Sequence, residues 1–366
     1  MKKTEIVLTG GHAGTTALAV VKEIRRRHPS WKICWIGARA AIEGKNIPTI
    51  ESRLFPEMGI NFKSIFTGRL QRKFTFWTIP SLLKIPFGFV HALVLLIDVK
   101  PKVILSFGGF AAFPVVVMGA FLRIPVVIHE QTVAVGRANR YSAPFAKKIA
   151  LARSESLNFF PKGKCVVVGN PILPEIEKIL PKERLSSPPE ILVTGGSRGS
   201  ITINSLISEI LEELLSKYKL IHHAGEIDFP KFEKKKSQLA VAAKERYEVY
   251  SHIPAKDMPK ILEKADIVVG RAGANTVSEI VAAKKPSILI PLPFSYLNEQ
   301  TKNADFAEKY GVAKVFPQEN LTGQKLLKEI DETVESWQAT VSYVKGKVSP
   351  DIGASRRLVS LIEEYI

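Results

Sequence analysis

A glycine-rich turn with one histidine opens the chain. The segment LTGGHAGTTALAV (8–20) places Gly10, Gly11 and Gly14 where a helix should begin, so that backbone amides can approach an anion. His12 lies inside this turn, where it can act as a general base or can simply hydrogen-bond its own loop. A dinucleotide site would also need an acidic residue about 20 positions later. The next apolar run, WKICWIG, ends without one, which argues against a nicotinamide dehydrogenase.

Two more candidate segments follow apolar runs in the first half of the chain. They contain Gly108 and Gly109 in SFGGFAAFP (106–114), and His129, Glu130, Gln131 and Thr132 in HEQTVAVGRANR (129–140). Ligands of parallel α/β sheets bind outside the carboxyl ends of the strands. We therefore expect these segments to share one rim with the His12 turn.

The second half has a glycine turn of its own in TGGSRGS (194–200). Its glycines, with the hydroxyl of Ser197 and the side chain of Arg198, could hold an anion at a helix start. The alternative is a strand-to-helix connection that requires the glycines only for its geometry. Spacing does not separate the two.

The segment RAGANTVSE (271–279) follows the apolar run ADIVV and allows two interpretations. Thr276 and Glu279 have the spacing of a capping box, in which both side chains bind backbone donors of their own helix. Alternatively, Gly273 and Ala274 present amides to a diphosphate while Glu279 accepts hydrogen bonds from a ribose diol. Arg271 is a possible cation for the same diphosphate.

The order of the expected elements predicts the fold. Strand, glycine turn, helix and strand open the chain, and the same pattern begins again at PEILVTGGSRGS (189–200). This predicts an α/β protein of two Rossmann-like parallel-sheet domains facing across a cleft. The first domain is expected over 1–168, with a closing amphipathic helix (about 350–366) packing back on it, and the second over 169–349.

The net positive charge lies entirely in the first half of the chain. Residues 1–170 hold 25 Lys and Arg against 8 Asp and Glu, a net charge of +17, and the remaining residues hold 27 of each. A basic half can bind nucleic acid or an anionic membrane. Neither an RNA-binding signature nor zinc-ligand spacing is present, so no nucleic-acid partner is expected. Two isolated cysteines, Cys34 and Cys165, fit a reduced compartment and no metal site.

One segment has the composition of a membrane surface. IPSLLKIPFGFVHALVLLI (79–97) is long enough to span a bilayer but contains Lys84, His91 and two prolines. Basic and large apolar residues are interleaved just before it, over 67–84, as in an interfacial segment. We expect a peripheral, membrane-dipping helix and no secretion signal at the N-terminus.

Seven motifs occur together in the order of one known family. They are TGGH, GGF, IHEQ, VVGNP, GGSRGS, RAGANTVSE and NEQTKNA, which run from residue 9 to residue 304. In these the chain resembles the MurG family of GT-B glycosyltransferases. The resemblance implies transfer of N-acetylglucosamine (GlcNAc) from UDP-GlcNAc to an undecaprenyl-diphosphate-linked MurNAc-pentapeptide (lipid I), giving lipid II. It implies inversion, no metal ion or cofactor, and a place on the cytoplasmic face of the membrane.

The resemblance also implies roles for individual residues. His12 would be the catalytic base. The donor contacts would be Ser197, Ile253, Arg271, Gly273, Ala274, Asn275, Thr276, Glu279 and Gln300, with Glu279 at the ribose, Gln300 at the sugar and the Ile253 backbone at the uracil. The acceptor contacts would be Thr9, Gly10, Gly11, Gly108, Gly109, His129, Glu130, Gln131 and Thr132.

The chain departs from the family pattern at three places. AGTTA follows His12 in place of an aromatic residue and a proline, Thr132 replaces the family's Asn after HEQ, and Leu173 replaces its Arg after GNP. These departures leave open a GT-B transferase for another lipid, such as diacylglycerol, and an epimerase of UDP-GlcNAc. A non-catalytic UDP-sugar-binding membrane protein is the alternative outside the enzymes.

Overall fold

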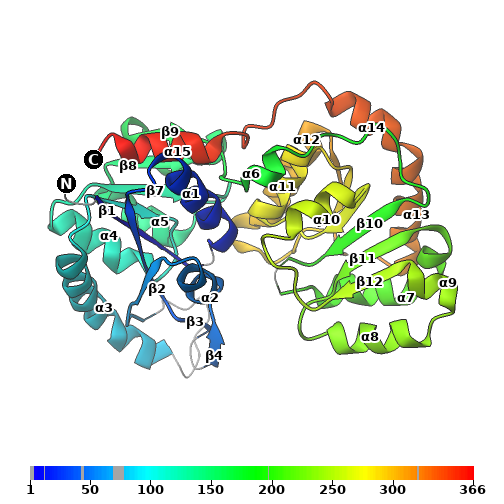
Figure 1. Cartoon of the computed structure of the whole chain (residues 1–366), viewed down its shortest axis with the longest axis horizontal. Helices are drawn as coiled ribbons and strands as arrows, with labels where there is room; N and C mark the ends of the chain where they lie inside the picture. Colours follow the sequence, from blue (N-terminus) through cyan, green and yellow to red (C-terminus); the bar gives the residue numbers. More distant parts are fainter. Residues whose placement is uncertain (1–3, 12, 43–44, 69–77, 197, 320) are drawn as a thin grey trace. The chain divides into compact units, whose positions relative to one another are not determined.

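The computed structural model describes residues 4–11, 13–42, 45–68, 78–196, 198–319 and 321–366. The chain forms two compact units, one of Met1–Ile172 with Gly353–Ile366 and the other of Leu173–Ile352. Figure 1 shows the elements of each unit.

The first unit is built on a seven-stranded parallel sheet in the order β5-β2-β1-β6-β7-β8-β9. Its strands are β1 (Glu5–Gly10), β2 (Lys32–Gly37), β5 (Asn61–Ser64), β6 (Val103–Ser106), β7 (Val126–Glu130), β8 (Lys148–Leu151) and β9 (Cys165–Val167), with a hairpin of β3 (Ala40–Ile42) and β4 (Lys45–Pro48) beside it. Its helices are α1 (Gly14–Arg27), α2 (Ile50–Glu57), α3 (Thr78–Val99), α4 (Ala112–Phe121), α5 (Arg137–Ser142) and α15 (Ala354–Glu363). The strand order reverses between β1 and β6, because β2 lies on the other side of β1.

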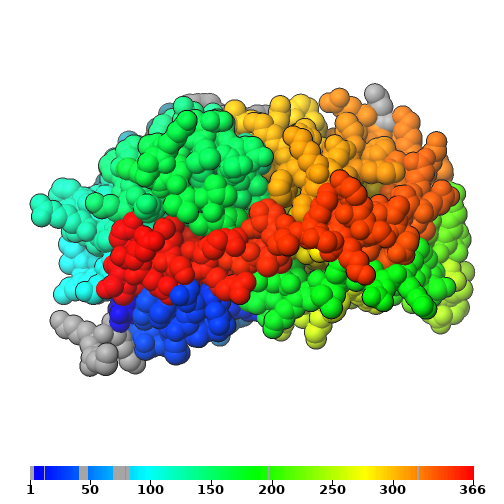
Figure 2. Space-filling model, turned by 90° about the horizontal axis from the view of Figure 1, so that it is seen from above, coloured from blue at the N-terminus to red at the C-terminus, as the bar shows by residue number. Residues whose placement is uncertain are grey.

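The last helix of the chain belongs to the first unit. Leu358 and Ile362 of α15 share an apolar core with Leu8 of β1 and Ile24 of α1. Arg27 reinforces this packing through an ion pair with Glu363 at 2.7 Å. Figure 2 shows the red C-terminal helix against the blue N-terminal segment.

The second unit repeats the arrangement with a six-stranded parallel sheet in the order β12-β11-β10-β13-β14-β15. Its strands are β10 (Glu190–Thr194), β11 (Lys219–His223), β12 (Tyr247–Tyr250), β13 (Ile267–Gly270), β14 (Ser287–Leu289) and β15 (Ala313–Val315). Its helices are α6 (Pro174–Glu177), α7 (Ile201–Lys217), α8 (Phe229–Gln238), α9 (Val241–Glu245), α10 (Met258–Lys264), α11 (Ala274–Ala283), α12 (Glu299–Tyr310), α13 (Gly323–Glu335) and α14 (Trp337–Val344). Here the order reverses between β10 and β13.

Both sheets are apolar on two faces, as buried parallel sheets must be. In β1, Leu8 packs into one core and Val7 into the core on the opposite face, where Leu96 of α3 and Val115 of α4 meet it. Successive residues of a strand point to opposite faces, so a continuous apolar run fills both layers. Two such sheets confirm the predicted α/β class with two parallel-sheet domains.

Candidate functional sites

The two glycine turns of the first unit meet at the β1/β6 switch point. The Gly11 N–H donates to the Gly108 carbonyl at 2.9 Å. Gly109 has φ of +91°, and a Cβ there would lie 2.8 Å from the Gly11 nitrogen. Only glycine meets both conditions, a left-handed φ and a bare backbone. Thr9, at the end of β1, has a buried hydroxyl without a hydrogen-bond partner among the described residues.

A carboxylate of the chain itself sits at the start of α1. The Ala13 N–H donates to Oε1 of Glu51 at 2.9 Å, and Glu51 is buried at the beginning of α2. A helix start favours negative charge, so Glu51 does for α1 what an external anion would do. No sequence motif pointed to Glu51, because it is 38 residues away from the turn that it binds. His12, the predicted base, lies outside the described residues.

Glu130, at the end of β7, holds its own loop together. Its Oε1 accepts from the amide and hydroxyl of Thr132 at 3.1 and 3.0 Å. Its Oε2 accepts from the Gly136 amide at 3.1 Å and from Nδ2 of Asn139 at 2.9 Å. Burial raises the pKa of Glu130, and these hydrogen bonds oppose that rise. These hydrogen bonds position the loop after β7, and the contact of Glu130 with the acceptor stays a prediction.

The neighbours of Glu130 are also held by hydrogen bonds within the first unit. Nε2 of His129 lies 3.1 Å from the Gly169 carbonyl oxygen, and the Thr132 hydroxyl bonds to Glu130 and to the Ala134 carbonyl. Gln131 reaches outward, and its Oε1 accepts from the Thr16 hydroxyl of α1 at 3.2 Å. This hydrogen bond ties the loop after β7 to the first turn of α1.

In the second unit, the glycine turn closes tightly against the end of β11. A Cβ on Gly199, whose φ is +76°, would lie 2.3 Å from the Ala224 carbonyl oxygen. A Cβ on Gly195 would lie 2.3 Å from the Ser200 nitrogen. The turn leads into α7, where the Ser200 hydroxyl caps the helix by accepting from the Ile203 amide. Ser197, a predicted donor contact in this turn, lies outside the described residues.

Arg271 follows β13 and is buried. Its Nε donates to the Ser200 hydroxyl at 3.1 Å, its Nη1 to the Ile290 carbonyl at 3.1 Å, and its Nη2 to Oε1 of Gln318 at 2.7 Å. These hydrogen bonds position the three loops that meet at Arg271. The side chain also lines a cavity of the second unit, and its contact with a diphosphate stays a prediction.

The segment RAGANTVSE contains the start of helix α11. This helix begins at Ala274, and Gly273 is its cap residue. The capping-box interpretation is wrong, because Thr276 lies inside the first turn and the cap residue is Gly273, which has no side chain. The start of α11 lies beside the end of β10, where the Arg271 amide donates to the Thr194 carbonyl. Asn303 of α12 fixes the turn through the Ala272 carbonyl at 3.1 Å.

Glu279 lies one turn further into α11 and is half-buried. Among the residues that the structure describes, none donates a hydrogen bond to its carboxylate or pairs with its charge. Burial alone raises its pKa to about 7. A buried carboxyl without partners costs free energy in its ionised form, so this position favours a ligand that brings hydrogen-bond donors.

A cavity of about 360 Å³ joins several of these groups in the second unit. Its lining contains Gly195, Arg198, Gly199, Ser200, Ile201, Thr202, Ala224, Ile227, Asp228, Arg271, Leu292 and Gln300. Oε1 of Gln300 accepts from the Leu292 amide at 2.9 Å. Ile253, in the loop after β12, is buried, and its backbone N–H and C=O make no hydrogen bond within the described residues.

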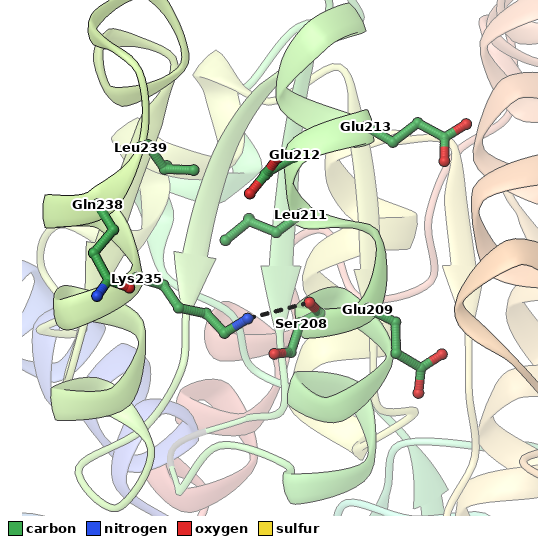
Figure 3. A pocket seen from close by; sticks show the side chains of 8 residues that line it. All are labelled: Ser208, Glu209, Leu211, Glu212, Glu213, Lys235, Gln238 and Leu239. Carbon is green, nitrogen blue, oxygen red and sulfur yellow. Dashed lines mark hydrogen bonds between the residues drawn. The ribbon is translucent and has the colours of Figure 1, made fainter.

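A second cavity, of about 340 Å³, lies between α7 and α8. Figure 3 shows Lys235 reaching the Ser208 carbonyl there, and the lining also contains Glu209, Glu212 and Glu213. Its lining includes none of the predicted site residues. It has no convergent backbone donors for an anion, and its acidic side chains do not suit a diphosphate.

Comparison with known proteins identifies the family. Residues 6–151 match the model of the glycosyltransferase family 28 N-terminal domain, and residues 190–347 match that of the C-terminal domain. A UDP-N-acetylglucosamine--N-acetylmuramyl-(pentapeptide) pyrophosphoryl-undecaprenol N-acetylglucosamine transferase from Halalkalibacterium halodurans is 32% identical over 90% of both chains. The chain belongs to the MurG family of glycosyltransferases.

Solved structures agree with this family at the level of the fold. The crystal structure of Acinetobacter baumannii MurG covers 99% of both chains with a TM-score of 0.69 at 23% identity. A UDP-GlcNAc 2-epimerase from Neisseria meningitidis bound to UDP-GlcNAc covers 99% of this chain and 100% of its own, with a TM-score of 0.65 at 14% identity. The GT-B fold is thus confirmed.

Proposed function

We propose that the protein transfers GlcNAc from UDP-GlcNAc to lipid I and so makes lipid II for peptidoglycan synthesis. The observation that carries this proposal is the likeness, over nine tenths of both chains, to a relative named for this reaction. The two switch points support it, because each offers glycine-lined backbone at a helix start, which suits a diphosphate. Both substrates of the reaction contain one.

The second unit would bind UDP-GlcNAc. The diphosphate would lie on the starts of α7 and α11, with Ser197 beside it, and the ribose diol would donate to Glu279. The open backbone of Ile253 would pair with the uracil, and Gln300 would contact the sugar. The remaining proposed donor contacts are Gly273, Ala274, Asn275 and Thr276. This arrangement gives the unpaired carboxyl of Glu279 the donors that it lacks in the free protein.

The first unit would bind the lipid-linked acceptor. Because Glu51 already takes the Ala13 amide, the acceptor diphosphate would lie on the Gly108–Gly109 side of the rim. Thr9, Gly10, Gly11 and Gln131 would line this site, and the loop containing His129, Glu130 and Thr132 would support it.

His12 would take the proton from the C4 hydroxyl of MurNAc. The hydroxyl oxygen then attacks the anomeric carbon of GlcNAc from the face opposite UDP, the bond from this carbon to the diphosphate oxygen breaks, and UDP leaves with the electron pair. Attack from the opposite face inverts the anomeric configuration. Without a metal ion, backbone N–H groups must stabilise the charge that develops on the diphosphate. Arg198, which is exposed and lines the cavity, is a cation that can approach it.

We further propose that the protein works at the cytoplasmic face of the membrane through α3. No described helix is long and apolar enough to cross a bilayer. Large apolar residues nevertheless form one exposed stripe along α3, each more than half exposed: Ile79, Leu83, Phe87, Val90, Val94 and Ile97. The +17 charge of residues 1–170 would meet anionic headgroups, at about 1 kcal/mol for each basic residue near the surface.

The direct test is to mix the protein with UDP-GlcNAc and a short-chain analogue of lipid I and to analyse the products by mass spectrometry. We expect a disaccharide product and one UDP for each transfer. UDP release without disaccharide, together with glycosylation of diacylglycerol, would favour the other lipid transferase. Nucleotide binding without UDP release would indicate a non-catalytic protein.

The base assignment needs its own test. If His12 removes the proton, His12→Ala should lower kcat about 10²-fold or more while the affinity for UDP-GlcNAc stays close to that of the wild type. His28, on the opposite end of α1 and paired with Glu363, provides a matched control in His28→Ala. Turnover of His12→Ala within a few fold of wild type would refute the assignment.

A further inference from the structure

A buried series of hydrogen bonds in the second unit ends at the 360 Å³ cavity. The Tyr247 hydroxyl lies 2.9 Å from Nδ1 of His222, and Nε2 of His222 lies 3.0 Å from Oδ1 of Asn204. Nδ2 of Asn204 donates to the Ala224 carbonyl at 2.8 Å and to Oδ2 of Asp228 at 2.7 Å. Tyr247, His222 and Asn204 are all buried, whereas Asp228 lines the cavity.

The chemistry of these groups determines which atom donates and which accepts in each of these hydrogen bonds. Both acceptors of the Asn204 amide nitrogen are oxygens, so Oδ1 of Asn204 faces His222 and must accept from its Nε2–H. Nδ1 of His222 therefore accepts from the Tyr247 hydroxyl. Burial lowers the pKa of His222 to about 3, so the ring is neutral, as this arrangement requires. Fully satisfied buried networks of this kind hold their members rigidly.

Asp228 has no structural task that would explain such support. It is the cap residue of α8, but its side chain makes no capping hydrogen bond there. Among the described residues, Asn204 donates to only one carboxylate oxygen of Asp228, Oδ2. Asp228 is half-buried in the lining of the 360 Å³ cavity. The same lining contains the glycine turn and Gln300.

The charge of a carboxylate in this cavity favours some parts of a nucleotide sugar over others as its neighbour. It repels a diphosphate and accepts hydrogen bonds from hydroxyl groups. We propose that Asp228 binds a hydroxyl of the transferred sugar and that Tyr247, His222 and Asn204 position it for this. This inference rests on one part of the proposed function, namely that the ligand of this cavity is a UDP-hexose. Asp228 would then help to determine which sugar is accepted.

The test compares two ligands that differ only by the sugar. Titration calorimetry gives the Kd of UDP-GlcNAc and the Kd of UDP for the wild type and for Asp228→Ala. We expect the variant to bind UDP-GlcNAc about tenfold more weakly or worse, the loss of one hydrogen bond to a charged group, with the Kd of UDP within twofold of wild type. Asp228→Asn keeps an oxygen that can accept from Asn204 but loses the charge. Its Kd for UDP-GlcNAc should therefore lie between those of the wild type and Asp228→Ala.

Glu226→Gln is the matched control, because Glu226 is exposed two residues earlier in the same loop and is absent from the cavity lining. It should change neither Kd. Thermal unfolding of each variant checks that the second unit is folded. Equal weakening of both ligands, or no weakening of either, would overturn the proposal for Asp228.

A separate measurement tests the proposed function: whether the wild-type protein forms disaccharide from UDP-GlcNAc and lipid I. Selective loss of UDP-GlcNAc binding without any disaccharide from the wild type would support Asp228 and contradict the lipid I transferase. Disaccharide formation without a selective loss would do the reverse.

Discussion

The half-buried carboxyl of Glu279 makes donor binding depend on pH. Burial raises its pKa to about 7, so about nine tenths of the free protein is ionised at this residue at pH 8 and about one tenth at pH 6. A ribose diol donates two hydrogen bonds and needs the ionised form as acceptor. The Kd of UDP-GlcNAc should therefore be about tenfold higher at pH 6 than at pH 8, or about 1.4 kcal/mol.

Titration calorimetry in two buffers of different ionisation enthalpy measures this linkage. UDP-GlcNAc is the ligand of choice because both of its phosphates are esterified, so the diphosphate does not titrate in this range. We expect release of nearly one proton for each ligand bound at pH 6. Glu279→Gln should abolish both the pH dependence and the proton release. At pH 8 it should weaken binding by about 1.5–3 kcal/mol, the range for a hydrogen bond to a charged group.

The same carboxyl should also make the stability of the free protein depend on pH. Rising pH strengthens binding of UDP-GlcNAc but lowers the free energy of unfolding. A folded-state pKa above the unfolded value means that the folded protein binds the proton more tightly, so the free energy of unfolding falls as pH rises from 4.5 through about 7. Glu279→Gln should therefore stabilise the free protein at pH 8, by up to about 3 kcal/mol. Glu263→Gln, exposed on α10, is the control. An unchanged Kd between pH 6 and pH 8, or an equal slope in Glu279→Gln, would refute the reasoning.

Three further predictions concern positioning residues. Gly109→Ala should lose about 1–3 kcal/mol of stability, because its Cβ would press on the Gly11 nitrogen at a left-handed φ; an unchanged midpoint in chemical denaturation would contradict this. Glu51→Ala should cost about 1–2 kcal/mol by leaving the Ala13 amide unpaired, and Glu51→Gln should restore most of it, as thermal unfolding would show. Arg271→Lys should raise the Kd of UDP at least tenfold, since an ammonium group cannot bridge three loops; a Kd like that of the wild type would count against this role.

The sequence was most informative where backbone geometry requires a residue type. Glycine pairs after apolar runs predicted the turns after β1, β6 and β10, because only glycine fits the close approach of Gly11 to Gly109 and of Gly199 to Ala224. The repeat of this pattern predicted two parallel-sheet units, which the structure confirms.

The sequence was least informative about side chains brought together by the fold. Glu130 and Arg271 have types that suit ligand binding, yet the structure uses them to hold loops together. Glu51 and Asp228 follow no local motif, because their partners lie 38 and 24 residues away. The capping-box interpretation was wrong because the helix is capped at Gly273, three residues before the Thr276 that local spacing selects.

The most direct test of the account is a structure of the protein with UDP-GlcNAc bound. The account predicts the diphosphate on the starts of α7 and α11, the ribose diol on Glu279 and the sugar in the cavity beside Asp228 and Gln300. UDP-GlcNAc bound in the first unit, or a ribose that does not reach the Glu279 carboxylate, would contradict it.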